Sequence, residues 1–304
     1  MTALRSLVAA TDLSAPARHA AERAALLARA HGAHLTVVHV PDRSSWNELT
    51  TWLGESSEAS SRLEKEQTDR LARLAEDLRQ HGAPTVDAVR RTGAVLEEIA
   101  KEAEARQADL LVVGARGEGF LRRLVMGSTA ERLLRRTTRP VLVARQVPRQ
   151  PYRRVLVAVD FSPWSAKALA LARQLAPQAH LTLFHAWQVP FEGKLHFAGV
   201  DLAAIEHYRR KARADALQQL TALASQARLP PGRWEPAVVE GNPSLRLVEQ
   251  EQESDADLIV MGKHGRSATE DLLLGSVTQH VLAEGTCDVL VSVGQDTEGT
   301  PPAP

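Results

Sequence analysis

The sequence has little of several features that would place it in a specialised class of protein. It holds one cysteine, Cys287, among 304 residues, so no disulfide can form within the chain. The formal net charge is zero, which gives no general electrostatic reason to bind nucleic acid or an anionic membrane. No apolar stretch approaches the ~20 residues that span a bilayer. We therefore expect a globular protein of a reducing, cytoplasmic compartment, without nucleic acid or membrane as partners.

Several sequence motifs are also missing. The N-terminal residues lead straight into a strand pattern rather than the charged and apolar segments of a secretory signal. There is no GxxxxGK[ST], which excludes a P-loop nucleotidase, no GxSxG and no kinase motif set. The histidines are scattered without the HExxH spacing, and a single cysteine excludes a cysteine-rich zinc site. The sequence thus offers no catalytic residues and no metal ligands.

What the chain does contain is a glycine pattern that occurs twice. Two glycines spaced by three positions are followed, after nine further residues, by a glycine–serine pair, and the two copies are separated by a constant 148 residues. The pattern comprises Gly114, Gly117, Gly127 and Ser128 in the first copy and Gly262, Gly265, Gly275 and Ser276 in the second. A repeated pattern in one register indicates a duplicated domain.

The duplication extends beyond the glycines. Asp12 and Asp160 keep the separation of 148, and each ends a short apolar run. His34 and His180 differ by 146 instead, so the second copy is two residues shorter early on and regains them before Gly241. We expect this length change to lie in a loop.

Apolar runs of strand length alternate with helical patterns in both copies. The first copy predicts strands at 6–10, 35–40, 86–89, 110–113 and 140–144, with helices at 16–30, 58–80, 95–106 and 128–136. The second predicts strands at 155–159, 181–185, 237–239, 258–261 and 289–293, with helices at 165–175, 201–226, 245–253 and 277–283. Such alternation is typical of α/β folds with a doubly wound parallel sheet. We predict two tandem, five-stranded, Rossmann-like domains at 1–147 and 152–294, a short connector with two prolines, and a disordered tail at 295–304.

The glycine loops point to an anionic ligand. Each begins where a strand ends, the edge at which parallel sheets bind ligands, and each is followed by a helix. Ser128 and Ser276 are candidate N-caps, and a helix start with free amides attracts phosphate. Asp12 and Asp160 could accept hydrogen bonds from a ribose hydroxyl or a base amine. These features suggest a nucleotide-like ligand; the alternative is that the glycines serve only turns and tight packing.

At this point the residues resemble a known family. The segment from Ala256 to Thr278 is similar to the universal stress protein signature, as is the first-copy segment from Ala108 to Ser128. The runs that begin at Asp12 and Asp160 resemble that family's first-strand motif. The resemblance covers nearly the whole chain and implies a tandem universal stress protein of the ATP-binding type.

The resemblance also implies which residues contact the nucleotide, here ATP with or without Mg²⁺. The glycine loop would hold the ribose and phosphates, the first-strand aspartate the nucleoside end, and the end of the second strand would border the adenine. The predicted residues are Asp12, Val40, Gly114, Arg116, Gly117, Gly127, Ser128 and Thr129 in the first copy, and Asp160, Ala186, Gly262, His264, Gly265, Gly275, Ser276, Val277 and Thr278 in the second.

The two copies are unequal. Thr278 supplies a hydroxyl where the first copy has Ala130. Arg116 could pair with phosphate more firmly than a mostly neutral His264, whereas Glu118, at the place of Arg266, would repel it. We expect both sites to bind nucleotide, with the second slightly ahead.

Three functions stay open. The sequence favours a nucleotide-binding stress or regulatory protein with little or no efficient catalysis, which acts on an unidentified protein partner. The alternatives are a slow ATPase or nucleotidyl transferase, and a scaffold that binds an apolar ligand or a protein. The resemblance further implies that strands 141–144 and 289–293 pair antiparallel, which would make the chain a pseudo-twofold dimer of domains and would cover two strand edges. Further homodimerisation is left open.

Overall fold

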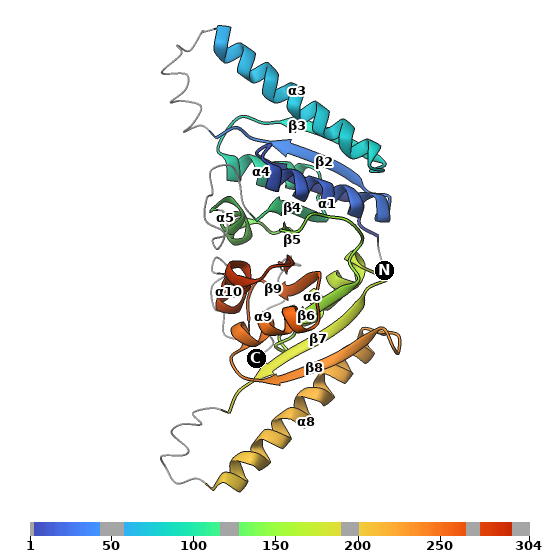
Figure 1. Cartoon of the computed structure of the whole chain (residues 1–304), viewed down its shortest axis with the longest axis vertical. Helices are drawn as coiled ribbons and strands as arrows, with labels where there is room; N and C mark the ends of the chain where they lie inside the picture. Colours follow the sequence, from blue (N-terminus) through green and yellow to red (C-terminus); the bar gives the residue numbers. More distant parts are fainter. Residues whose placement is uncertain (1–2, 43–57, 116–127, 190–200, 266–273, 294–304) are drawn as a thin grey trace, which may run out of the picture. The chain divides into compact units, whose positions relative to one another are not determined.

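A computed structural model describes residues 3–42, 58–115, 128–189, 201–265 and 274–293. Its contacts divide the chain into two units, residues 1–151 with 290–304 and residues 152–289. The elements of both units are labelled in Figure 1. Within the described ranges, no helix combines the length and the apolar character needed to cross a membrane.

The first unit is a parallel sheet with helices between successive strands. Its strand order is β3-β2-β1-β4-β5, and the pairs β1–β2, β2–β3, β1–β4 and β4–β5 are all parallel. The strands are β1 (Ser6–Thr11), β2 (His34–His39), β3 (Thr85–Arg90), β4 (Leu110–Gly114) and β5 (Val141–Ala144). The helices are α1 (Ala15–His31), α3 (Glu58–Gln80), α4 (Val95–Ala105) and α5 (Ser128–Arg136).

The second unit repeats this plan. Strand β6 lies between β9 and β7, β8 is at the outer edge, and β10 follows β9 in the strand order. The strands are β6 (Arg154–Ala158), β7 (His180–Trp187), β8 (Trp234–Glu240) and β9 (Leu258–Gly262), followed by β10 (Asp288–Ser292), which begins in this unit and continues past its boundary at residue 289. The helices are α6 (Pro163–Leu175), α8 (Leu202–Gln226), α9 (Pro243–Glu253) and α10 (Ser276–Glu284).

The topology fixes where a ligand can bind. The chain runs outward from β1 to β2 and β3 and then returns to β4 on the other side of β1, and β6 to β9 repeat this reversal. Ligands of doubly wound sheets bind at such a switch point, beyond the carboxyl ends of the strands. The predicted tandem doubly wound α/β fold is confirmed. The pseudo-twofold pairing of the fifth strands concerns how the units lie relative to each other and stays a prediction.

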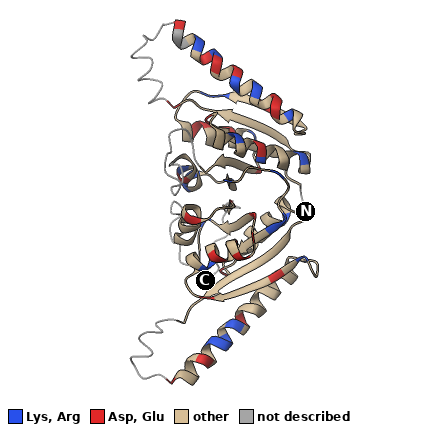
Figure 2. Ribbon diagram, viewed as in Figure 1, with Lys and Arg blue, Asp and Glu red and all other residues tan. Residues whose placement is uncertain are grey.

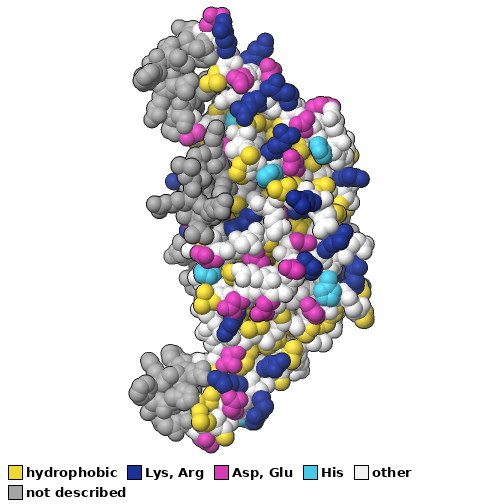
Figure 3. Space-filling view, in the orientation of Figure 1, with side chains coloured by type: hydrophobic (Ala, Val, Ile, Leu, Met, Phe, Trp, Pro, Cys, Tyr) yellow, Lys and Arg dark blue, Asp and Glu magenta, His cyan; other side chains and the backbone are white. Residues whose placement is uncertain are grey.

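Helices bury one stripe and expose the rest. In α3 the buried residues Leu71, Leu74, Ala75 and Leu78 follow helical spacing. Charged residues recur along α3, whereas in α8 they occupy only part of the helix (Figure 2). On the face drawn in Figure 3, acidic, basic and apolar side chains are interspersed rather than gathered by type. This surface is typical of charged helices that cover a sheet.

The expected bounds of β8 are corrected, and the length change between the copies can be placed. Strand β8 runs from Trp234 to Glu240, longer than the predicted 237–239, and it includes Pro236. Proline lacks an N–H group, which an edge strand tolerates. After α8, Leu229 makes the same backbone hydrogen bond as Ala83 does after α3, and these two residues are 146 positions apart. In the strand register, Trp234 is equivalent to Val86, and these two are 148 positions apart. The two residues that the second copy regains therefore lie between α8 and β8.

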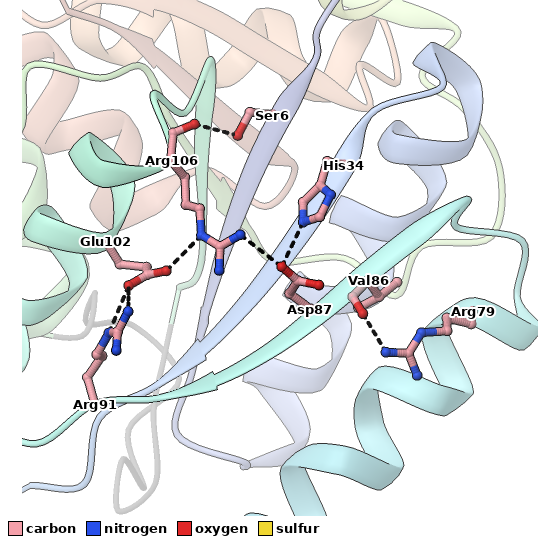
Figure 4. A network of polar contacts seen from close by, with 8 residues as sticks. All are labelled: Ser6, His34, Arg79, Val86, Asp87, Arg91, Glu102 and Arg106. Carbon is pink, nitrogen blue, oxygen red and sulfur yellow. Dashed lines mark hydrogen bonds and ion pairs between the residues drawn. The ribbon is translucent and has the colours of Figure 1, made fainter.

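A polar network ties α4 of the first unit to the sheet (Figure 4). The buried carboxylate of Glu102 accepts from Arg91 Nε at 2.8 Å and from Arg106 Nε at 3.0 Å. Arg106 also donates to Asp87, which lies 3.1 Å from His34 Nε2. Burial acts to raise the pKa of Asp87, but the hydrogen bond from Arg106 and the charge of His34 together lower it. The buried carboxylate of Glu102 is stable because the guanidinium groups of Arg91 and Arg106 both pair with it.

Each unit uses a glutamate to hold the loop before its last strand. In the second unit, buried Glu251 Oε1 accepts from Thr286 N at 2.8 Å, Thr286 Oγ1 at 2.7 Å and Cys287 N at 2.6 Å. In the first unit, Glu104 accepts from Arg139 Nη2 at 2.6 Å and Thr138 Oγ1 at 2.8 Å. The hydrogen bond from Arg139 lowers the pKa of Glu104. The same task is done by a buried carboxylate in one unit and an exposed one in the other.

Two polar contacts hold the C-terminal end of the connector. Buried Arg23 of α1 donates from Nη1 to the carbonyl oxygen of Gln150 at 2.9 Å. Tyr152 donates its hydroxyl to Asp288 Oδ2 at 2.6 Å within the second unit. Both contacts lie within two residues of the point where the second unit begins.

Candidate functional site

A tight turn follows the first strand of each unit. Leu13 and Phe161 adopt left-handed backbone conformations, with φ of 65° and 61°. Residues other than glycine rarely adopt this backbone conformation, and where they do the residue is often part of a functional site. The turn places Ser14 and Ser162 at the N-caps of α1 and α6.

In the second unit the aspartate of this turn is held firmly. Asp160 Oδ1 accepts from Ser162 N at 3.0 Å, Ser162 Oγ at 2.6 Å and Ser165 Oγ at 2.7 Å. A β-carbon placed on Gly265 would lie 3.3 Å from the other carboxylate oxygen, Oδ2. The carboxylate therefore faces the glycine loop, as its position beyond the strand predicted.

In the first unit the corresponding contacts differ. Asp12 Oδ1 accepts from Ser14 N at 3.0 Å, and the hydroxyl of Ser14 accepts from Ala17 N at 3.4 Å. Arg70 of α3 donates to the carbonyl oxygen of Leu13 at 3.1 Å, so a guanidinium group lies at this strand end.

A histidine joins the ends of the first two strands in both units. His39 Nδ1 lies 2.8 Å from the carbonyl oxygen of Thr11, and His185 Nδ1 lies 2.8 Å from that of Val159. Burial lowers the pKa of His39, and the charges of Arg90 and Arg70 add to that effect. Sequence reasoning missed this role, although both histidines stand immediately before the predicted residues Val40 and Ala186.

The second unit has an aromatic surface at the same place. The Phe161 and His185 rings lie 4.4 Å apart, centroid to centroid. Trp164 lies 6.3 Å from the His264 ring and has Lys167 Nζ 4.6 Å from its own centroid.

The glycine loop of the second unit brings the end of β9 against the start of α10. Gly275 N donates to the carbonyl oxygen of Lys263 at 3.0 Å, and Thr278 Oγ1 donates to that of Gly262 at 3.1 Å. A β-carbon on Gly262 would lie 3.0 Å from Trp164 Cβ, so this glycine allows close packing. The hydroxyl of Thr278 thus links the start of α10 to the end of β9. The sequence predicted a ligand contact for Thr278 and did not predict this hydrogen bond.

The expected N-cap of α10 is wrong by one position. Gly275 is the N-cap and makes no side-chain cap hydrogen bond, while Ser276 is the first helical residue and is exposed. Glycine at this position lets the backbone approach Lys263, which a larger residue would hinder.

These residues surround one cavity of about 480 Å³ in the second unit. All nine positions predicted for the second copy line it, from Asp160 and Ala186 to the start of α10. The lining residues that sequence reasoning did not predict are Ala158, Val159, Trp164, Ser165, Phe184, His185, Pro243, Leu247 and Met261. They come from the C-terminal halves of β6, β7 and β9, from the position just after β6 and from the starts of α6 and α9. Most are apolar, and an apolar residue there is indistinguishable from a core residue by pattern alone.

The first site is described only in part. Asp12 follows β1, Val40 is buried just after β2, and Gly114 ends β4. Ser128 begins α5, and Thr129 is exposed in its first turn. The remaining predicted residues lie outside the described ranges: Arg116, Gly117 and Gly127. Glu118, Arg266 and the tail 295–304 also lie outside them.

No group of three or more His, Cys, Asp or Glu side chains is arranged to hold a metal ion in the described ranges. Asp160 is the one acidic residue among the described residues that line the cavity.

The family model described as the universal stress protein family matches residues 4–145 and again residues 151–292. The chain belongs to the universal stress protein family. A universal stress protein of Mycolicibacterium smegmatis is 29% identical over 94% of this chain and 96% of its own length. Another, from Mycobacterium bovis, is 32% identical over 62% of this chain, and the match spans about 60% of that relative.

Solved structures of this family share the fold. The crystal structure of a universal stress protein from Archaeoglobus fulgidus is 20% identical, with a TM-score of 0.69, over 96% of this chain and 97% of its own. A universal stress protein solved in complex with cAMP aligns with 48% of this chain at 24% identity and a TM-score of 0.37.

Proposed function

We propose that this universal stress protein binds ATP, acts as a regulator in a stress response and has little catalytic activity. The observation that carries the proposal is the cavity of the second unit, where Asp160 faces Gly265 across the switch point of the sheet. Its volume falls within the range of about 300–1,000 Å³ that is common for small-molecule sites.

The lining residues suit the parts of a nucleotide. Asp160 can accept a hydrogen bond from a ribose hydroxyl or a base amine. The apolar and aromatic side chains of Phe184, His185 and Met261 suit a planar base. Gly262 and Gly265 permit close backbone approach, and the start of α10 has amides and a positive dipole end for phosphate.

The same cavity argues against efficient turnover. Phosphoryl transfer needs a residue that orients the nucleophile near the transferred phosphate. Asp160, the one acidic lining residue in the described ranges, follows β6, while the start of α10 follows the glycine loop. In this proposal Asp160 contacts the nucleoside, which leaves no acidic lining residue of the described ranges to orient a nucleophile at the far phosphate.

A second candidate is a scaffold that binds an apolar ligand. Leu247, Met261 and Phe184 give the cavity a substantial apolar wall, which a planar or aliphatic molecule without phosphate would also fill.

Native mass spectrometry of the purified chain, followed by calorimetric titration with ATP and with cAMP, tests the proposal. We expect one or two ATP per chain, and weaker ATP binding in an Asp160→Asn variant. A protein that binds neither nucleotide would refute the proposal and favour the scaffold. Steady multiple-turnover release of ADP, lost in a Gly265→Val variant, would favour the enzyme.

A further inference from the structure

The two units differ in one side chain that contacts the first-strand aspartate. Ser165 stands on the first turn of α6, and the residue 148 positions earlier, on the first turn of α1, is Ala17. Both are buried, with exposed fractions of 4% each. Only the second unit therefore has a hydroxyl group at this position.

The hydroxyl of Ser165 makes two contacts with the same residue. Ser165 Oγ accepts from Asp160 N at 3.0 Å and donates to Asp160 Oδ1 at 2.7 Å. It thereby fixes both the backbone and the carboxylate of Asp160. Because Ser165 is buried, these hydrogen bonds are shielded from competing water.

The hydrogen bonds to Asp160 Oδ1 also orient the other carboxylate oxygen, Oδ2. Oδ1 accepts from Ser162 N, Ser162 Oγ and Ser165 Oγ, and these three donors fix the rotation of the carboxylate. Oδ2 is then directed toward Gly265, and both Asp160 and Ser165 line the cavity. A side chain that is already immobilised loses less entropy when a ligand binds.

We infer that Ser165 is a positioning residue of the second site: it orients Asp160 to accept a hydrogen bond from the nucleoside part of the ligand. Ala17 leaves the first unit without this support, so the second site binds more tightly. This inference rests on the proposed nucleotide function.

Calorimetric titration of the whole chain with ATP tests it, in an Asp12→Asn background that weakens the first site. We expect Ser165→Ala to weaken ATP binding about three- to tenfold, as the loss of one preorganised side chain predicts. Ser165→Thr, which keeps the hydroxyl, should restore part of the affinity. In a chain that also carries Asp160→Asn, Ser165→Ala should have no further effect, because the serine acts through the aspartate.

The reciprocal variant is Ala17→Ser, measured in an Asp160→Asn background that weakens the second site. It should tighten ATP binding at the first site, and it remains informative if Ser165→Ala fails to fold. Two results would overturn the inference while the unmodified chain still binds ATP. One is an equal loss of ATP affinity from Ser165→Ala in chains with Asp160 and in chains with Asp160→Asn. The other is an unchanged ATP affinity in both Ser165→Ala and Ala17→Ser. An unmodified chain that binds no ATP would overturn the proposed function as well.

Discussion

At the residue scale, buried polar side chains are the most sensitive points of the structure. His39 is 5% exposed, and its Nδ1 contacts the carbonyl oxygen of Thr11. That oxygen can only accept, so Nδ1 carries the proton. Burial, with the charges of Arg90 and Arg70, lowers the pKa of the imidazole, against the opposing effects of the Thr11 hydrogen bond and the charge of Asp12. The folded protein therefore keeps His39 neutral below the pH at which the unfolded chain takes up a proton.

This difference predicts a pH dependence of stability. As the pH falls below the unfolded pKa of about 6.5, the unfolded chain binds a proton that folded His39 does not, so the free energy of unfolding should decrease. The loss should end once the pH passes the lower folded pKa. An asparagine can still donate to Thr11, so His39→Asn should show a shallower decrease between pH 7.5 and 5.5 in urea unfolding. Identical slopes in the two proteins would contradict the prediction.

Glu251 is the second sensitive residue. Glu251→Ala removes the acceptor of Thr286 N, Thr286 Oγ1 and Cys287 N, and should lower the free energy of unfolding by about 2–4 kcal/mol. The matched control is Glu249→Ala on the same helix, whose ion pair with Arg246 is half-exposed and should contribute less than about 0.5 kcal/mol. Urea unfolding of both variants measures the difference, and equal losses would show that Glu251 does not hold the loop.

At the element scale, the strand-to-helix connection after β9 depends on glycines with separate tasks. A β-carbon on Gly262 would meet Trp164 Cβ at 3.0 Å and the carbonyl oxygen of His264 at 3.1 Å, neither of which can move easily. A β-carbon on Gly265 would meet Asp160 Oδ2 at 3.3 Å, on the side of the cavity. The first glycine thus permits the packing, and the second keeps the carboxylate accessible.

Two substitutions separate these tasks. Gly262→Ala should lower both the melting temperature and the affinity for ATP, because α6 and the loop must move apart. Gly265→Ala should leave the melting temperature within about 2 °C of the unmodified chain, as expected for a change at an exposed position, yet weaken ATP binding about tenfold or more. Thermal unfolding and calorimetry measure the two properties. A Gly265→Ala variant with full affinity would show that the ligand does not approach Asp160 from this side.

At the scale of the whole molecule, duplication has produced two units with the same topology and different strand-end chemistry. The first unit places Arg70 over its turn, while the second places Phe161 and His185 in ring contact at the equivalent point. We predict that the two units respond to a ligand separately.

Hydrogen exchange of the intact chain tests this separation. ATP at about one hundred times its dissociation constant should stabilise the unit that binds it by ~2.7 kcal/mol. We expect slower exchange in peptides that contain the end of β9 and the start of α10, and we expect Asp160→Asn to abolish that protection. The same variant should leave any protection of peptides around β1 and β4 unchanged. Loss of protection in both units would indicate that the two sites are coupled.

The sequence predicted the elements well because each has a strong local signal. Strands such as Val155–Ala158 are continuous apolar runs, and α3 was placed within its observed bounds, Glu58–Gln80, by the spacing of its leucines. Strand β8 was underestimated because Pro236 and the charged Glu235 interrupt its pattern. Their position at a sheet edge, which relaxes both constraints, is a property of the tertiary structure.

The sequence by itself determined the duplication, the doubly wound fold and the predicted positions that meet at the switch point of the second unit. All of these follow from periodicity and from the repeated spacing of aspartate and glycine. Only the tertiary structure decided that His39 and His185 join strand ends, that Ser165 orients Asp160, and that Thr278 closes the glycine loop. These contacts join residues on different elements or depend on side-chain rotation, and neither leaves a local pattern in the sequence.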